Sequence, residues 1–520
     1  GTGRRPLTAP RAPSPPVGGK WAPTAKTMTI PDPLTGAAMV TVPDTSPEEA
    51  RAFSTSLARV PKSGLHNPLK RPERYAMYGE VTARAAAEMA RPEVEAFFAR
   101  LVQRTSPKSI AQATTEVVVT RRFLDNFGGD QPRFAAAGRV VPGDRAGQFS
   151  TAHRWPFGPV GLITPFNFPI EIPALQLMGA LYMGNKPLLH TDRRVSIVVE
   201  QFVRLLHFCG APLADVDLLH GAGPVAGAAI KAGGARSTLF TGSRAVAEKL
   251  CADLGGRVFL EDAGFDWKIL GPDVSPSSLP HAAWQCDQDA YACSGQKCSA
   301  QSMLFMHQNW VDAGIEDALK KRAAARTLSD LTIGPVLTWT TDAMLAHVGK
   351  LLAIPGARLA FGGRKLEGEG AALIPARYGA IEPTAVHVPL SSLTDPAHFA
   401  TATTEVFGPV QVLTTYGDEE VDAVLACLER MDAHLTAAVV SNDPVFTNRI
   451  LANTVNGTTY AGALARTTGA PQNHWFGPAG DPRAAGIGTP EAIRLVWSCH
   501  REIVTDVGPA AGDGAALVTT

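Results

Sequence analysis

The chain has 520 residues, of which 45% are hydrophobic and 18% are charged, so it can bury a large core and its composition excludes a disordered protein. The 48 basic and 48 acidic residues cancel, which excludes a global electrostatic footprint for nucleic acid or an anionic membrane. The odd number of its cysteines, seven, argues against a disulfide framework, and the absence of a C-x-x-C pair argues against a zinc site. We therefore expect no nucleic-acid partner, no membrane partner and no metal.

The two ends of the chain differ from its middle. Residues 1–30 hold five basic residues, six prolines and no acidic residue. An Arg-rich, acid-poor segment is typical of an organelle transit segment or its remnant, and a disordered basic tail is the alternative. Residues 509–520 are rich in Gly and Ala and are predicted to be a second tail.

Helical composition dominates residues 46–108, with Ser46 and the acids after it as a start signal. Residues 138–154 are strand-like. From residue 157 onward short apolar runs alternate with helical stretches, and such alternation predicts βαβ units with a parallel sheet. The expected strands are 160–164, 187–190, 216–220, 237–240 and 258–260, and the expected helices between them are 172–183, 196–208, 225–232 and 243–254.

A second α/β run is expected from about Ala282 to Val440. Residues 467–490 are rich in Gly and Pro and lack periodicity, so they predict a long irregular loop, which in a compact enzyme is usually functional.

Several motifs follow the predicted strands, where ligands of parallel sheets bind. Gly221 to Gly227 resembles a dinucleotide fingerprint, but its spacing differs and no acidic residue follows at the expected distance, so it is a weak signal. Phe240-Thr-Gly-Ser243 opens a helix whose free N–H groups favour phosphate, with an ordinary Ser cap as the alternative.

Three further positions suit catalysis. Cys298, in Gly295-Gln-Lys-Cys298, is a candidate nucleophile whose pKa Lys297 would lower, and a buried small residue is the alternative. Glu261 and Asp262 end an apolar strand, and either could act as a general base, or the pair could be a helix cap or a solvated strand end. Asn167 could donate to an oxyanion, or form an Asx turn.

Taken together and in this order, the motifs resemble the aldehyde dehydrogenase superfamily over roughly residues 31–508. They are T-P-F-N-F-P (164–169), F-T-G-S (240–243), L-E (260–261), G-Q-K-C (295–298), E-V-F-G-P-V (405–410) and W-F-G-P (475–478). Longer segments at 260–270, 284–301 and 467–483 are similar to the plant-type Δ1-pyrroline-5-carboxylate dehydrogenases. Members of that group are mitochondrial enzymes of proline catabolism that oxidise glutamate γ-semialdehyde to glutamate.

The resemblance implies an α/β fold in three parts. A Rossmann-like NAD-binding domain would comprise residues 31–138 and 156–279. An α/β catalytic domain would comprise residues 280–489, with a substrate loop at 467–490. A small β-hairpin element for oligomerisation would comprise residues 139–155 and 490–508, giving a homodimer or homotetramer. The resemblance also implies the mitochondrial matrix and a small-molecule aldehyde substrate.

The resemblance also implies roles for individual residues. Cys298 would attack the aldehyde, Asn167 and the Cys298 N–H would hold the oxyanion, hydride would pass to NAD⁺, and Glu261 would activate water to release the acid from a thioester. Thr164, Phe166, His190, Ser243, Glu405 and Phe407 would bind the cofactor, and Phe168 and Phe476 would wall the aldehyde pocket.

This sequence departs from the family pattern near the cofactor. His190 stands where a Lys is usual and Arg193 where a Glu is common, with Arg194 beside it, so NAD is expected and NADP is not excluded. Ala263-Gly264-Phe265 replaces Gly-Gly-Lys, and Ala247 replaces a Gly. Asp262 would raise the pKa of Glu261 if both side chains point the same way.

Other functions stay open. The chain could oxidise another ω-semialdehyde, such as succinate semialdehyde, or be a catalytically silent relative. A thiol hydrolase would pair Cys298 with His281, His307 or His474, none of which lies in a supporting motif. Cys293 could form a disulfide with Cys298 under oxidation, or serve only in packing.

Overall fold

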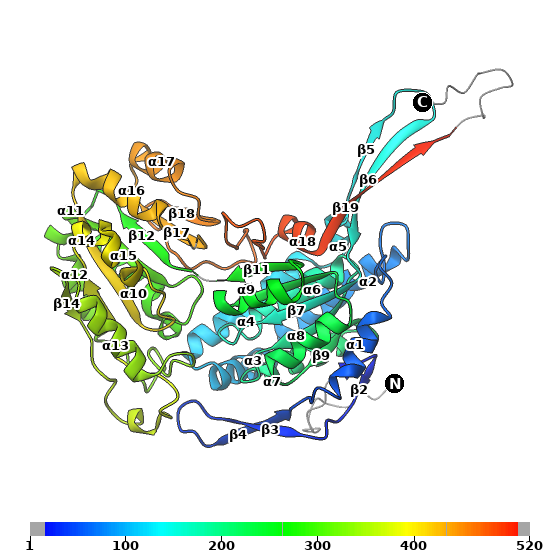
Figure 1. Cartoon of the computed structure of the whole chain (residues 1–520), viewed down its shortest axis with the longest axis horizontal. Helices are drawn as coiled ribbons and strands as arrows, with labels where there is room; N and C mark the ends of the chain where they lie inside the picture. Colours follow the sequence, from blue (N-terminus) through cyan, green and yellow to red (C-terminus); the bar gives the residue numbers. More distant parts are fainter. Residues whose placement is uncertain (1–15, 263, 433, 508–520) are drawn as a thin grey trace.

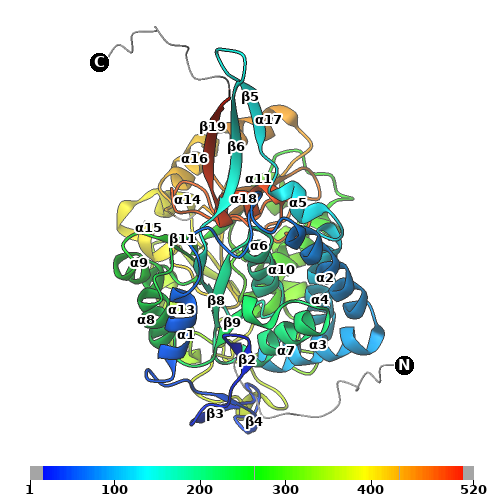
Figure 2. The same cartoon turned by 90° about the vertical axis from the view of Figure 1, so that its right-hand side faces the viewer.

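A computed structural model describes residues 16–262, 264–432 and 434–507. The two α/β halves lie side by side, each around its own sheet, and a narrow three-stranded arm projects from one of them (Figures 1 and 2). Residues 1–15, in the predicted N-terminal tail, and residues 508–520, which comprise the predicted C-terminal tail and the last residue of the predicted hairpin element, lie outside the described residues. Among the described residues, no helix combines the length and the apolar character that a membrane span requires.

The first half contains the predicted parallel sheet. Its strand order is β11-β10-β7-β8-β9, and every neighbouring pair is parallel. The central strands are buried along their whole length, as their continuous apolar runs require. The strands are β7 (Pro159–Thr164), β8 (Lys186–Thr191), β9 (Asp217–Leu219), β10 (Ser237–Gly242) and β11 (Val258–Asp262).

Helices cover both faces of this sheet and form two separate hydrophobic cores. One face packs against α2 (Glu73–Met89), α3 (Pro92–Thr105), α4 (Ile110–Asn126), α6 (Glu171–Tyr182) and α7 (Ser196–Phe208), with α5 (Gln131–Ala135) beside them. The other face packs against α1 (Ala50–Ala58), α8 (Gly223–Ala232) and α9 (Arg244–Asp253). The doubly covered parallel sheet confirms the predicted fold class.

The helix start predicted at Ser46 uses a reciprocal cap. The Ser46 N–H donates to Glu49 Oε2 at 2.8 Å, and the Glu49 N–H donates to Ser46 Oγ at 3.2 Å. The α-helix itself begins at Ala50.

The second half is built on a seven-stranded sheet of order β14-β15-β16-β13-β12-β17-β18, in which only β14 is antiparallel to its neighbour. The strands are β12 (Asp266–Leu270), β13 (Gln301–His307), β14 (Arg358–Phe361), β15 (Thr384–His387), β16 (Val410–Tyr416), β17 (Thr436–Val440) and β18 (Thr458–Ala461). The helices are α10 (Leu279–Tyr291), α11 (Gln308–Asp312), α12 (Ile315–Ala323), α13 (Thr341–Leu352), α14 (Leu390–Thr394), α15 (Pro396–Ala402), α16 (Val421–Glu429) and α17 (Pro444–Ala452).

β12 changes one predicted boundary. The sequence places residues up to 279 with the nucleotide-binding half, but β12 pairs with β13 and β17 in the second sheet. The chain therefore crosses between the halves shortly after Glu261. A buried cation explains why this strand was missed: Lys268 is fully buried in β12 and forms an ion pair with Asp289 of α10 at 2.7 Å.

The described part of the N-terminal segment is structured, contrary to the tail expected for residues 1–30. β1 (Pro16–Val17) pairs with β2 (Lys20–Trp21), and β3 (Thr27–Pro31) pairs with β4 (Ala38–Pro43). Trp21 stacks over the Arg204 guanidinium, which fixes the first hairpin to α7. The second hairpin runs along the lower edge of the molecule towards the other half (Figure 1).

The predicted 139–155 and 490–508 element forms the arm. β5 (Arg139–Pro142), β6 (Gln148–Pro156) and β19 (Ser498–Asp506) make an antiparallel sheet that extends away from the body, with α18 (Pro490–Trp497) at its base (Figures 1 and 2). Between β18 and α18 the described chain forms no helix or strand, which confirms the irregular loop predicted at 467–490.

Candidate active site

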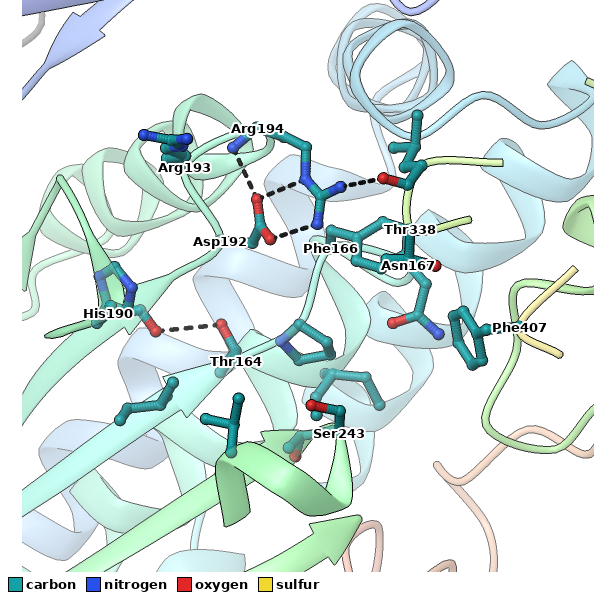
Figure 3. Close-up of a pocket in the computed structure, with 18 of the residues that line it drawn as sticks. Thr164, Phe166, Asn167, His190, Asp192, Arg193, Arg194, Ser243, Thr338 and Phe407 are labelled. Carbon is teal, nitrogen blue, oxygen red and sulfur yellow. Dashed lines mark hydrogen bonds and ion pairs between the residues drawn. The ribbon is translucent and has the colours of Figure 1, made fainter. Parts of the chain in front are cut away.

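A cavity of about 1100 Å³ lies at the carboxyl ends of the first sheet and reaches the second half. Asn167, Glu261, Cys298 and Glu405 line it together, although they are far apart in the sequence. Figure 3 shows the cavity from the side of Thr164 and Asn167. Its position is the one that a doubly wound sheet predicts for a ligand.

The nucleophile candidate Cys298 follows a tight turn. Cys293, Ser294 and Gly295 all have left-handed backbone conformations, with φ of 55°, 56° and 71°. Gly295 cannot be replaced without rearrangement, because a Cβ there would lie 2.1 Å from the Gly408 carbonyl oxygen. The turn leaves the Cys298 side chain half-buried, on the wall of the cavity.

The structure overturns the expected role of Lys297. Its ammonium donates to the Gln288 carbonyl at 2.9 Å and to Thr468 Oγ1 at 3.0 Å, away from the thiol. Burial and the carboxyls of Glu261, Asp266 and Glu405 instead hold the pKa of Cys298 well above its ordinary value. The thiol therefore needs a base to take its proton before it can attack.

Glu261 is the candidate for that base, because it lines the same cavity. It lies at the end of β11, where its pKa is raised to about 7, chiefly by burial, while the Cys298 thiol and the Thr241 hydroxyl beside it oppose the rise. Asp262 contributes a smaller increase, in the direction that the sequence predicts. A carboxyl with this pKa exchanges protons near neutral pH.

β11 is braced from outside the sheet. The Leu260 N–H donates to the Arg483 carbonyl at 2.8 Å, and the Ala485 N–H donates to the Leu260 carbonyl at 2.9 Å. The 467–490 loop thus extends the edge of the strand that carries Glu261. Arg483 also pairs with Glu248 of α9 at 2.9 Å, which fixes the loop to the first half.

Asn167 lies in the connection from β7 to α6, and its Nδ2 donates to the Gln296 carbonyl at 3.1 Å. This contact joins the amide to the turn that carries Cys298. Buried Lys108 donates to the Asn167 carbonyl at 2.5 Å and pairs with Glu116 at 2.8 Å. Sequence reasoning missed Lys108 and Glu116, because only the tertiary packing brings α4 against this connection.

The opposite end of the cavity suits a phosphate-bearing ligand. β10 ends at Gly242, and α9 begins directly after Ser243. Ser243 is exposed, makes no side-chain capping hydrogen bond with its own helix and lines the cavity (Figure 3). Its hydroxyl and the N–H groups of Arg244 and Ala245 therefore stay available to a ligand. Gly221 and Pro224, from the weak fingerprint, line the same end.

His190 is held in one orientation at the end of β8. Its Nδ1 lies 3.1 Å from the Leu219 carbonyl oxygen, so Nδ1 carries the proton and Nε2 has a lone pair. Burial lowers the pKa of His190, which keeps the ring neutral. Thr164 contacts the backbone of the same residue, its Oγ1 lying 3.5 Å from the His190 carbonyl (Figure 3).

Arg193 and Arg194 behave differently, although both line the cavity. Arg194 pairs with Asp192 at 2.6 Å, donates to the Leu337 carbonyl at 2.6 Å and stacks over Phe166 (Figure 3). Arg193 is exposed, and within the described chain it forms no ion pair. One guanidinium at this rim is therefore open to a ligand.

Glu405 and Phe407 reach the cavity from the second half. Burial raises the pKa of Glu405 to about 8, while the nearby Gly264 backbone opposes the rise. Phe407 packs edge-on against Phe166, with ring centroids 6.0 Å apart.

The two expected substrate aromatics do not line this cavity. Phe168 packs, partly buried, against the first core, and Lys108 Nζ lies 4.6 Å from its ring centroid. Phe476 is buried in the same core, within the 467–490 loop, and bridges to Ile487. That loop also reaches the nucleophile, since Thr468 contacts both Lys297 and Ser299.

Comparisons with known proteins agree with this geometry. The family model described as "Aldehyde dehydrogenase family" matches residues 21–480. The chain is 58% identical over 494 residues to "Delta-1-pyrroline-5-carboxylate dehydrogenase 12A1, mitochondrial" from Arabidopsis thaliana, covering 95% of this chain and 88% of that protein. It is 26% identical over 372 residues to malonate-semialdehyde dehydrogenase 1 from Geobacillus thermodenitrificans, covering 68% and 73% of the two chains.

A solved structure shares the fold. Betaine aldehyde dehydrogenase from Staphylococcus aureus, in complex with NAD⁺, superposes with a TM-score of 0.81 at 19% identity and covers 96% of each chain. The family model spans both sheets and the cavity between them. The chain therefore belongs to the aldehyde dehydrogenase family.

Proposed function

We propose that this protein oxidises glutamate γ-semialdehyde, which is in equilibrium with Δ1-pyrroline-5-carboxylate, to glutamate, with NAD as the hydride acceptor. The observation that carries the proposal is the meeting of Cys298, Glu261 and Asn167 on one cavity. The family membership and the name of the Arabidopsis relative support the reaction and its substrate. The same name supports a mitochondrial location, and we assign the matrix.

The residues divide the chemistry into two easier steps. Cys298 loses its proton to a neighbouring carboxylate, a role we assign to Glu261, and its thiolate attacks the aldehyde carbon. The Asn167 amide and the Cys298 N–H stabilise the oxyanion, each donor contributing about 3 kcal/mol. Bound NAD supplies the hydride acceptor that converts the adduct on Cys298 into a thioester. Glu261, with its pKa of about 7, releases the first proton to solvent and then takes a proton from the water that attacks the thioester, which frees the acid and returns Cys298 as its thiolate.

The cavity fits a dinucleotide. The open α9 N-terminus and Ser243 would hold the pyrophosphate, and the His190 Nε2 lone pair would accept a hydrogen bond from a ribose hydroxyl. Glu405 would hold the nicotinamide ribose, Phe407 would pack near the nicotinamide, and Thr164 and Phe166 would shape the floor.

Arg193 bears on the choice between the two dinucleotides. Its guanidinium would attract a 2′-phosphate, because Arg194 already neutralises Asp192. A neutral His190 accepts rather than donates, so it favours the hydroxyl of NAD. We therefore assign NAD as the preferred cofactor and NADP as a usable second one.

The 467–490 loop is assigned to the aldehyde tail, with the rings of Phe168 and Phe476 supporting the pocket from the core behind it rather than lining the cavity. The arm is assigned to assembly into a homodimer or homotetramer, because it exposes Val140, Val141, Phe149 and Val504 beyond the body of the protein.

The decisive assay compares substrates. Steady-state reduction of NAD⁺ is measured with Δ1-pyrroline-5-carboxylate and with succinate semialdehyde. A kcat/KM at least about tenfold higher for the first substrate supports the proposal, since about 1.4 kcal/mol of selective binding produces that ratio. An equal or higher value for succinate semialdehyde overturns the substrate and retains the family. No turnover with any aldehyde favours a catalytically silent relative.

A further inference from the structure

Glu171 is a buried acid that the chemistry above does not use. It is the first residue of α6, follows the Asn167 connection closely and is 6% exposed. We propose that Glu171 receives the ammonium group of the substrate and thereby makes the site selective for an amino-aldehyde. This inference rests on the proposed function, because it concerns the tail of the same substrate.

The carboxyl of Glu171 has no partner in the described chain. The hydrogen bond at this residue is made by its backbone N–H, which donates to Glu116 Oε1 at 3.3 Å. Lys108, the nearby cation, is committed to Glu116 and to the Asn167 carbonyl. Buried polar groups are nearly always paired, so an unpaired carboxyl nine-tenths buried points to a missing ligand.

Glu171 lies near the reacting groups, although it is not itself among the residues that line the cavity. Ile172, the next residue, lines the cavity together with Cys298 and Glu261. Cys298 and Phe168 pack against the same core that α6 helps to form. Glu171 is also close enough to the Glu261 carboxyl for the two charges to influence each other. The small exposed part of Glu171 includes its carboxyl oxygens, whereas Glu261 Oε2 is fully enclosed.

The charges around Glu171 favour a cation. Burial, followed by the Glu116 carboxylate, raises the pKa of Glu171 to about 8; Lys108 opposes the rise, and Glu261 adds a smaller increase. An ammonium group next to Glu171 would stabilise its carboxylate and lower that pKa. The carboxylate tail of succinate semialdehyde would meet like charges at the same place.

A proton relay from Glu261 is the competing role for Glu171. A relay acts on the common chemical step, so its loss would lower kcat for every aldehyde in the same proportion. Recognition of the ammonium group acts on one class of substrate, and its loss would raise KM for amino-aldehydes alone. The comparison of substrates therefore separates the two roles.

The test uses Glu171→Gln, which keeps the size of the side chain and removes its charge. We expect kcat/KM for Δ1-pyrroline-5-carboxylate to fall at least about tenfold, mainly through KM, while the value for succinate semialdehyde stays within about threefold or rises. Glu419→Gln, on an exposed turn, is the control and should match the wild type with both substrates. Parallel losses with both substrates, or no loss with either, overturn the inference.

A binding measurement on the wild-type protein tests the same inference without any substitution. Calorimetry with the wild-type protein compares L-glutamate with glutarate, which lacks the amino group. We expect glutamate to bind more tightly, and its advantage to grow from about pH 6.5 to about pH 8.5 as Glu171 ionises. Equal binding at all pH values overturns the inference. Failure of the wild type to prefer Δ1-pyrroline-5-carboxylate would instead refute the proposed function, so the two failures are distinguishable.

Discussion

Glu261→Gln is the substitution whose effect the structure defines best. It keeps the shape of the side chain and removes the carboxylate that we propose takes a proton from the Cys298 thiol and from water. A positioned general base contributes about 10²–10⁴-fold to rate. At about 1.36 kcal/mol per tenfold, kcat should fall by the equivalent of about 2.7–5.4 kcal/mol.

The pH dependence supplies a second, independent readout. The pKa of Glu261 is raised to about 7, so the carboxylate that acts as the base prevails above that pH and is lost below it. At a pH one unit above the pKa about 90% of the carboxyl is ionised, and one unit below about 10%. Wild-type kcat should therefore rise through about pH 7 and level off near pH 8, whereas Glu261→Gln should lack this limb.

The assay is stopped-flow and steady-state formation of NADH from about pH 5.5 to pH 9. Asp262→Asn is the matched control, because this neighbouring carboxyl adds only a small increase to the pKa of Glu261 and does not line the cavity. It should retain kcat within about threefold. A Glu261→Gln enzyme that keeps more than about a tenth of the wild-type kcat, with the same pH profile, would refute the assignment of the base.

Cys298→Ala should lower kcat by at least about 10³-fold without changing the melting temperature. The control, Cys499→Ser on the arm, should remain active. An active Cys298→Ala enzyme would exclude Cys298 as the nucleophile. Arg193→Glu should lower kcat/KM for NADP⁺ at least about tenfold and leave kcat/KM for NAD⁺ within about threefold. The formation of NADH and NADPH measures both values. An unchanged ratio of the two kcat/KM values would place Arg193 away from the 2′-phosphate. Lys268→Met leaves Asp289 without its buried cationic partner and should lower the free energy of unfolding by about 3–5 kcal/mol, measured by urea unfolding. A loss below about 1 kcal/mol would contradict a buried ion pair. Val140→Asp combined with Val504→Asp should reduce the molar mass measured by light scattering, and an unchanged mass would remove the arm from the interface.

The parallel sheet of the first half could be predicted because its strands are continuous apolar runs separated by helical stretches. β12 could not, because Lys268 interrupts its apolar pattern and becomes tolerable only next to Asp289 of α10. The N-terminal strands could not either, since their Pro-rich and basic composition is that of a tail. Their partners, such as Arg204 for Trp21, lie far along the chain.

The candidate site, like the fold, could be predicted only where the sequence carries a local signal. Motif order identified Cys298, Glu261 and Asn167, and the fold brings them to one cavity. The direction of Lys297 could not be read from its neighbour Cys298, because Thr468, which lies far along the chain, decides it. Glu171 carried no motif at all, and only burial without a partner distinguishes it.

The central claim is that this chain makes glutamate by way of Cys298. The most direct measurement incubates the protein with Δ1-pyrroline-5-carboxylate and NAD⁺, then quantifies glutamate by mass spectrometry and NADH by absorbance. The account predicts equal amounts of glutamate and NADH, and neither product with Cys298→Ala. NADH without glutamate, or glutamate from the Cys298→Ala protein, would contradict it.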